Sequence, residues 1–200
     1  MKEPFRRIFD VTLSVVILIL TSPVIVLAAL AIKLTSRGPV IYRQQRVGYR
    51  GHHFNVLKLR SMVAGAEHKG AGLAVNKGDA RITRVGRLLR RTGLDELPNL
   101  INVIRGEMSI IGPRPTVQVQ VDQYTARQLR RLEIRPGITG WAQVNGRASL
   151  PWPERIEMDI DYIDKRSTRL DLHILRLTAR QVFSGGDDHY KGETGGWKEQ

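Results

Sequence analysis

The alternation of apolar and polar residues changes abruptly near the N-terminus. Residues 11–32 form a stretch of 22 residues without a charged side chain. As a helix with a rise of 1.5 Å per residue, this stretch would be about 33 Å long, which is close to the roughly 30 Å hydrocarbon core of a bilayer. It is too long for the apolar part of a cleaved signal peptide. The pattern therefore predicts a membrane helix within residues 1–36.

Ser22 and Pro23 interrupt this uncharged stretch near its middle. Proline removes a backbone hydrogen bond and kinks a helix, and a neighbouring serine hydroxyl can bond a freed carbonyl. Basic residues flank the stretch on both sides, with Arg6 and Arg7 before it and Lys33 after it. Because positive flanks mark the cytoplasmic side, a helix that turns back within the membrane is favoured over one that spans it. A kinked spanning helix is the alternative, since such helices tolerate proline.

The rest of the chain alternates between patterns typical of strands and of helices. Residues 40–59 (VIYRQQRVGYRGHHFNVLKL) predict two short strands joined by a glycine-rich turn, that is, a β-hairpin. In residues 81–91 an arginine recurs at every third position opposite an apolar stripe, which predicts a basic amphipathic helix. The charged face of that helix suits solvent, a membrane surface or phosphate groups.

Further helices are predicted over residues 97–104, 116–133, 154–165 and 168–183, and a short strand over residues 141–144. The expected fold is therefore α/β and mostly α, with a re-entrant, non-spanning membrane helix (1–36) followed by one cytosolic domain (37–183). A short hairpin and interfacial amphipathic helices belong to that domain. Residues 184–200 contain several glycines and little apolar content, so a flexible tail is expected there.

The net charge of the chain predicts an anionic partner. The chain has 32 Lys and Arg residues against 19 Asp and Glu, a formal net charge of +13, and the excess is concentrated in the first half. Nucleic acid, an anionic membrane surface and phosphorylated small molecules all fit such a charge. The chain contains no cysteine. Disulfides and thiolate metal sites are therefore excluded.

Two adjacent carboxylates, Asp95 and Glu96, are the main candidates for chemistry. The spacing Thr92-x-x-Asp95 matches a capping box at a helix start, which would give the pair a structural role. Alternatively, nearby arginines hold the carboxylates ionised, so that Asp95 can attack phosphorus or bind Mg²⁺. Such a site also needs cations for the phosphate oxygens. Three arginines stand beside turns and are candidates: Arg90, Arg114 and Arg147.

Taken together, these motifs make the sequence resemble a bacterial sugar transferase of the small monotopic phosphoglycosyl transferase type, a polyprenyl-phosphate sugar-1-phosphate transferase. The resemblance covers residues 5–178, and motifs of this length and order are highly specific. They are RRIFD (6–10), the Ser22-Pro23 break, GPVIYRQQRVG (38–48), FNVLKLRSM (54–62), DARITRVGRLLRRTGLDELPNLINVIRGEMSIIGPRP (79–115), RPGITGWAQVNGR (135–147) and DYIDKRSTRLDLHIL (161–175). One departure is Gly93, where a larger polar residue is common in the family.

The resemblance implies an enzyme that moves a sugar-1-phosphate from a UDP-sugar to polyprenyl (undecaprenyl) phosphate. The products would be UMP and a polyprenyl-diphosphate sugar, the first membrane intermediate of a bacterial polysaccharide, O-antigen or glycoprotein pathway. Such an enzyme requires Mg²⁺. It would lie in the bacterial inner membrane with its catalytic domain facing the cytoplasm, and a homodimer is compatible with the resemblance.

Roles for individual residues follow from the same resemblance. Asp95 would attack the β-phosphorus, carry a covalent phosphosugar and ligate the metal, while Glu96 would assist it. Ser22 and Pro23 would form the re-entrant break. The substrate phosphates would be bound by five basic residues: Lys58, Arg60, Arg90, Arg114 and Arg147.

Two other classes of protein compete with this interpretation. A nucleic-acid-binding protein with a membrane anchor would also be basic, but aromatic residues are sparse and no binding motif is present, so nucleic acid is not an expected partner. An inactive scaffold that recruits glycan enzymes is the second alternative. The presence of Asp95, Glu96 and Arg114 argues against it.

Overall fold

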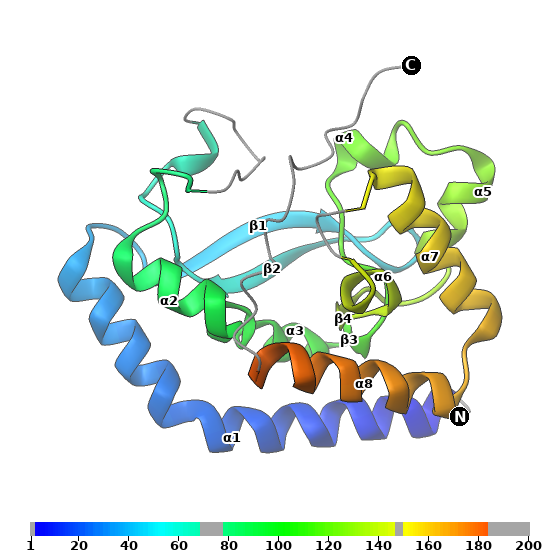
Figure 1. Cartoon of the computed structure of the whole chain (residues 1–200), viewed down its shortest axis with the longest axis horizontal. Helices are drawn as coiled ribbons and strands as arrows, with labels where there is room; N and C mark the ends of the chain where they lie inside the picture. Colours follow the sequence, from blue (N-terminus) through cyan, green and yellow to red (C-terminus); the bar gives the residue numbers. More distant parts are fainter. Residues whose placement is uncertain (1–2, 69–77, 147–149, 184–200) are drawn as a thin grey trace.

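The computed structural model describes residues 3–68, 78–146 and 150–183. Within these ranges the chain is mostly helical, as expected, and a short antiparallel hairpin crosses the middle of the molecule (Figure 1). The predicted tail 184–200, the segment 69–77 and the candidate Arg147 lie outside the described residues.

The first element, α1, is a helix of 33 residues, Glu3–Thr35, that contains Pro23. Figure 1 shows it as two arms that meet at an angle. Pro23 cannot donate to the carbonyl of Ile19, and the hydroxyl of Ser22 donates to that carbonyl instead, at 2.8 Å. The predicted local compensation at the proline is therefore confirmed. Among the described residues, α1 is the one helix whose length and composition would let it cross a membrane.

The predicted hairpin is confirmed. Strands β1 (Ile41–Val47) and β2 (His53–Leu59) pair antiparallel and are joined by the 3₁₀ turn η1 (Tyr49–Gly51). Gly51 adopts a φ of 81°, a left-handed conformation that favours glycine. This turn keeps the two strands in register, so alternate residues of both strands share one face.

Two helices with a short turn between them follow the hairpin. Helix α2 (Arg84–Thr92) overlaps the predicted basic amphipathic segment 81–91, and α3 (Asn99–Arg105), which overlaps the predicted helix 97–104, ends at Gly106. The 3₁₀ turn η3 (Leu94–Glu96) connects them. Helix α2 packs very close to the end of β2, since a Cβ added at Gly86 would lie 1.8 Å from the Ser61 carbonyl oxygen.

The predicted strand over residues 141–144 is wrong, because these residues form the helical turn α6 (Trp141–Val144). The strand lies just before it, at β4 (Gly137–Thr139), and pairs in parallel with β3 (Ser109–Ile111). The backbones meet so closely that a Cβ on Gly137 would lie 2.1 Å from the Gly112 nitrogen. This contact between glycines distant in sequence fixes the strand position.

The single helix predicted over residues 116–133 is also wrong. Thr125 accepts a hydrogen bond from the backbone of Gln128 and forms a capping box with it, which starts a new helix in the middle of that range. The segment is therefore divided into three short pieces: α4 (Gln118–Val121), α5 (Ala126–Leu129) and the 3₁₀ turn η4 (Arg130–Leu132).

The last two helices agree with the prediction, and α7 (Trp152–Lys165) is followed by α8 (Thr168–Phe183). A further 3₁₀ turn, η2, covers Ala66–His68. The main hydrophobic core lies between the hairpin, α3, the β3–β4 pair and the last two helices. Its buried members are Phe54, Val56, Val103, Met108, Ile110, Ile111, Val144, Tyr162 and Ile174.

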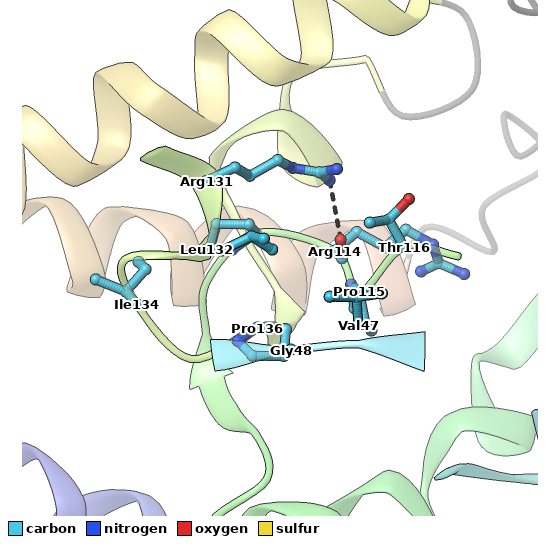
Figure 2. Close-up of a pocket in the computed structure, with 10 residues that line it drawn as sticks. Val47, Gly48, Arg114, Pro115, Thr116, Arg131, Leu132, Ile134 and Pro136 are labelled. Carbon is cyan, nitrogen blue, oxygen red and sulfur yellow. Dashed lines mark hydrogen bonds between the residues drawn. The ribbon is translucent and has the colours of Figure 1, made fainter. Parts of the chain in front are cut away.

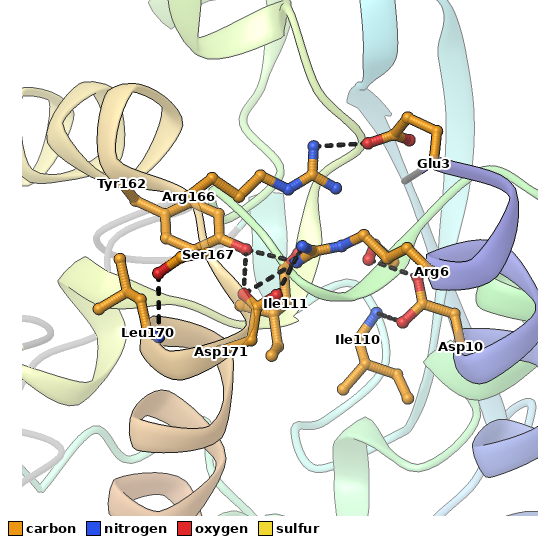
Figure 3. Close-up of polar contacts among 11 residues, drawn as sticks. Glu3, Arg6, Asp10, Ile110, Ile111, Tyr162, Arg166, Ser167, Leu170 and Asp171 are labelled. Carbon is orange, nitrogen blue, oxygen red and sulfur yellow. Dashed lines mark hydrogen bonds and ion pairs between the residues drawn. The ribbon is translucent and has the colours of Figure 1, made fainter. Parts of the chain in front are cut away.

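A buried polar network attaches the first arm of α1 to the domain (Figure 3). The Arg6 guanidinium donates to both carboxylate oxygens of Asp171, at 2.7 and 3.1 Å, and to the hydroxyl of Tyr162. One turn further along, the Asp10 carboxylate accepts a hydrogen bond from the Ser109 hydroxyl at 2.6 Å. These contacts join α1 to α7, α8 and β3.

The second arm of α1 is attached to the same domain by different contacts. Ile32 is buried against Leu59 of β2 and Leu89 of α2. Beyond the end of the helix, the Arg60 guanidinium donates to the carbonyl and the hydroxyl of Ser36, at 2.8 and 2.7 Å. Both ends of α1 are therefore held by one folded unit.

Candidate functional site

The two adjacent carboxylates lie in η3, immediately after α2. Gly93 ends α2 with a φ of 70°, and a side chain at this position would be strained. The capping box predicted from Thr92 and Asp95 does not form, because Thr92 is the last residue of α2 and its hydroxyl donates back to the Leu88 carbonyl. Asp95 is buried, with 8% of its surface exposed, and is free of a capping role.

Glu96 is held by two cations from different parts of the chain. Its Oε1 accepts hydrogen bonds from Lys58 Nζ at 2.5 Å and from Arg114 Nη2 at 3.2 Å. Burial alone would raise the pKa of Glu96, but Lys58 and Arg114 outweigh burial and hold this pKa below its usual range. Glu96 is therefore ionised, and it fixes the positions of both cations.

The environment of Asp95 shifts the pKa of its carboxyl group in the opposite direction, upward. Burial, and then the negative charge of Glu96, raise the pKa of Asp95, although Lys58, Arg90 and Arg114 counteract this shift. The expectation that nearby cations hold the carboxylates ionised is thus confirmed for Glu96, whereas burial reverses the direction of the pKa shift for Asp95. Within the part of the chain that the structure describes, the Asp95 carboxylate accepts no hydrogen bond. Its oxygens are available to a ligand.

The structure brings four of the predicted partners together around Asp95: Glu96, Lys58, Arg90 and Arg114. Arg90 is oriented by a hydrogen bond from its Nε to the Ser61 hydroxyl at 2.7 Å. Arg60 lies apart, because its guanidinium binds Ser36 beyond the end of α1. Ser22 and Pro23 lie within α1.

Sequence reasoning missed two arginines next to Arg114. Burial, and then the charge of Arg114, lower the pKa of Arg46 on β1 to about 10. Burial and the same neighbour lower the pKa of Arg155 on α7. For Arg46 a signal was present, since Tyr42, Gln44 and Arg46 alternate along β1 on the face that also carries Lys58 through its pairing with Tyr42.

A buried arginine, Arg131, holds the backbone of the loop that carries Arg114. Arg131 is buried between an ion pair with Asp159, at 2.6 Å, and a hydrogen bond to the Arg114 carbonyl, at 2.9 Å. A small cavity lies between this loop, the end of β1 and the segment after Arg131, and Figure 2 shows the Arg114 guanidinium extending away from Leu132 and Ile134. The cavity thus lies behind the loop, while the Arg114 side chain contacts Glu96.

Of the two carboxylates, Asp95 is the one that would suit a magnesium ion. In the described ranges no group of three or more His, Cys, Asp or Glu residues could hold a metal by itself. Mg²⁺ is usually held by one or two carboxylates plus substrate phosphates. Because the Asp95 oxygens accept no hydrogen bond from described residues while Glu96 Oε1 binds two cations, Asp95 is the better ligand.

Comparisons with known proteins give this arrangement a context. Residues 1–185 match the family model described as bacterial sugar transferase. The uncharacterized sugar transferase EpsL of Bacillus subtilis is 41% identical over 89% of this chain and 87% of that protein. The UDP-glucose:undecaprenyl-phosphate glucose-1-phosphate transferases of Escherichia coli and Caulobacter vibrioides are 46% and 45% identical over 90% of this chain. The matched region spans 40% of the former protein and 70% of the latter.

Proposed function

This chain belongs to the bacterial sugar transferase family, and we propose that it transfers a sugar-1-phosphate from a UDP-sugar to undecaprenyl phosphate. The products are UMP and an undecaprenyl-diphosphate sugar, which begins the assembly of a glycoconjugate. The observation that carries the proposal is the buried Asp95 carboxylate, which accepts no hydrogen bond from described residues and lies next to the Glu96–Lys58–Arg114 cluster. Relatives whose names state this acceptor support it.

In the first step, an Asp95 oxygen attacks the β-phosphorus of the donor. The bond from that phosphorus to the bridging oxygen breaks, and UMP leaves with the electron pair. A sugar-phosphoryl-aspartate remains. Lys58, Arg90 and Arg114 surround Asp95 and neutralise the phosphate oxygens, which is the largest contribution that a protein makes to phosphoryl transfer. Mg²⁺, held by Asp95 and the donor phosphates, would supply further charge neutralisation.

In the second step, an oxygen of undecaprenyl phosphate attacks the same phosphorus. The bond between phosphorus and Asp95 breaks, and the carboxylate recovers its electron pair. The acceptor phosphate is already anionic, so no general base is needed. Glu96 acts as a positioning residue, because its contacts hold Lys58 and Arg114 at the reacting phosphate.

UMP release tests the proposed reaction directly. The purified protein, supplied with undecaprenyl phosphate and Mg²⁺, is expected to release UMP from at least one member of a panel of UDP-sugars. Omitting the acceptor should limit release to about one UMP per enzyme, and EDTA should stop it until Mg²⁺ is restored. No UMP from any UDP-sugar, together with salt-sensitive binding of RNA or DNA, would favour a nucleic-acid-binding protein instead.

We also propose that α1 enters the cytoplasmic leaflet and returns to the same side. Arg6 at one end and Ile32 at the other are both buried against the same domain, so a spanning helix would separate contacts that the fold keeps together. Between these attachments α1 exposes large apolar side chains, among them Ile19, Leu20 and Leu27, each more than 60% exposed. An exposed apolar surface of this kind suits lipid.

Cysteine labelling tests this topology, and the chain has no native cysteine to interfere. Single cysteines replacing the exposed residues Glu3 and Arg37 are expected to resist a membrane-impermeant maleimide in intact cells and to react after lysis. The unmodified chain should stay unlabelled in both conditions. Labelling of one position but not the other in intact cells would indicate a spanning helix.

A further inference from the structure

Arg46 is directed by the hairpin toward the same region as Lys58. In the register of the two strands Tyr42 pairs with Lys58 and Arg46 pairs with Phe54, so all four side chains lie on one face. Lys58 shows where this face points, since its ammonium group binds Glu96. The neighbouring Val47 backbone N–H donates to the Thr116 carbonyl at 2.8 Å, which fixes the end of β1 against the loop that carries Arg114.

The guanidinium of Arg46 has no ion-pair partner among the described residues. Its guanidinium donates to the Gln44 amide oxygen at 2.5 Å, and this partner carries no charge. No ion pair involving Arg46 occurs in the described ranges, whereas the carboxylate of Glu96 is already shared by Lys58 and Arg114. Burial and the adjacent Arg114 lower the pKa of Arg46, and the charge of Glu96 opposes this shift only in part. A partly buried cation without an ion-pair partner is typical of a site that receives an anion.

A second arginine approaches Arg114 from a different element. Arg155, in the first turns of α7, donates through Nε to the Leu150 carbonyl at 2.7 Å, which orients its guanidinium. Burial, and then the charges of Arg114 and Arg131, lower its pKa. Asp159, the ion-pair partner of Arg131, also raises the pKa of Arg155, but to a smaller extent than burial and the two arginines lower it. Two cations, one from β1 and one from α7, therefore flank the arginine that contacts Glu96.

We propose that Arg46, together with Arg155, binds the phosphate of a nucleoside diphosphate donor that does not react, the one that leaves as part of UMP. The inference rests on the proposed function. In an in-line displacement the leaving group lies opposite the attacking Asp95. Lys58, Arg90 and Arg114 stabilise the negative charge of Asp95, whereas the charged neighbours of Arg46 are Arg114 and Glu96. The reacting phosphate then contacts Arg114, and the next phosphate contacts Arg46.

Kinetics of matched variants test this assignment. Arg46→Gln is expected to raise the KM for the UDP-sugar and the inhibition constant of UMP by about 10- to 100-fold, the effect of losing a hydrogen bond between charged groups. Arg46→Lys should lie between this variant and the wild type, because lysine keeps the charge but not the planar fork. Arg43→Gln is the control, since Arg43 is exposed on the opposite face of the same strand and should change both constants less than twofold.

Thermal unfolding separates a binding role from a structural one. Without ligand, Arg46→Gln should unfold at the same temperature as the wild type or higher, because a partly buried charge without an ion-pair partner has been removed. UDP should raise the unfolding temperature of the wild type and of Arg43→Gln but not of Arg46→Gln. Lower stability of Arg46→Gln with intact protection by UDP would assign Arg46 a structural role and overturn the proposal.

Two further outcomes would also overturn it: a wild type that UDP does not protect, and an Arg46→Gln variant whose KM changes for undecaprenyl phosphate alone. Protection by UDP requires no turnover, so it distinguishes this inference from the proposed reaction. If UDP protects the wild type but not Arg46→Gln, while no UDP-sugar yields UMP, the nucleotide site stands and the proposed transfer fails.

Discussion

Replacing Asp95 with asparagine is expected to reduce UMP release on the order of 10⁴-fold or more, the scale at which losing a nucleophile acts in enzymes with covalent intermediates. Asparagine keeps the size of the side chain but has no negative charge with which to attack phosphorus. The fold should be preserved, because the Asp95 carboxylate accepts no hydrogen bond from described residues and its charge is disfavoured by burial and by Glu96. The unfolding temperature of the variant should therefore equal or exceed that of the wild type.

Intact-mass measurement identifies the step that is lost. Wild-type protein incubated with donor and Mg²⁺, without undecaprenyl phosphate, should gain the mass of one sugar phosphate, and Asp95→Asn should gain none. Asp161→Asn provides the control, because Asp161 is on α7 and its ion pair with Lys165 lies on the surface. If product forms with acceptor present although no donor ever adds mass, the transfer occurs in one direct displacement and Asp95 only positions the substrate.

The parts of the fold that sequence reasoning predicted are those whose determinants are close together in the chain. Gly106 ends α3, and the glycine-rich turn around Gly51 connects the two strands of the hairpin. Local sequence patterns were therefore sufficient to predict these elements. The strand β4 was misplaced because Trp141 and Val144 favour strands intrinsically. Its real position depends on the contact between Gly112 and Gly137, which a local pattern does not show.

The candidate site was also predicted only in part. Asp95, Glu96 and Arg114 were predicted from their motifs, but burial determines the direction of the pKa shift of Asp95, and burial depends on packing. Strand alternation would have placed Arg60 on the face of Lys58, yet β2 ends at Leu59 and Arg60 turns toward α1 instead. Arg46 was missed because its charged neighbours Glu96 and Arg114 come from separate elements, and only folding brings them to β1.

Arg6→Met is expected to lower the free energy of unfolding by about 3–5 kcal/mol, because it leaves the buried carboxylate of Asp171 without its cation. Both side chains of this pair are less than 10% exposed. Arg127→Met is the control, because it removes an arginine from the exposed pair with Glu157 and should cost less than about 1 kcal/mol. Denaturant unfolding in detergent measures both values.

The double variant Arg6→Met with Asp171→Leu tests whether an uncompensated charge causes the loss. It should be more stable than Arg6→Met alone, because an apolar pair of similar volume often replaces a buried ion pair without a large penalty. If the double variant is instead the less stable of the two, packing rather than charge dominates at this site.

Arg6→Met should also reduce UMP release by more than the loss of folded protein explains. Arg6 also contacts the Ile111 carbonyl, which precedes the loop of Arg114, so Arg6→Met should displace that loop and lower UMP release even at temperatures where the variant is fully folded.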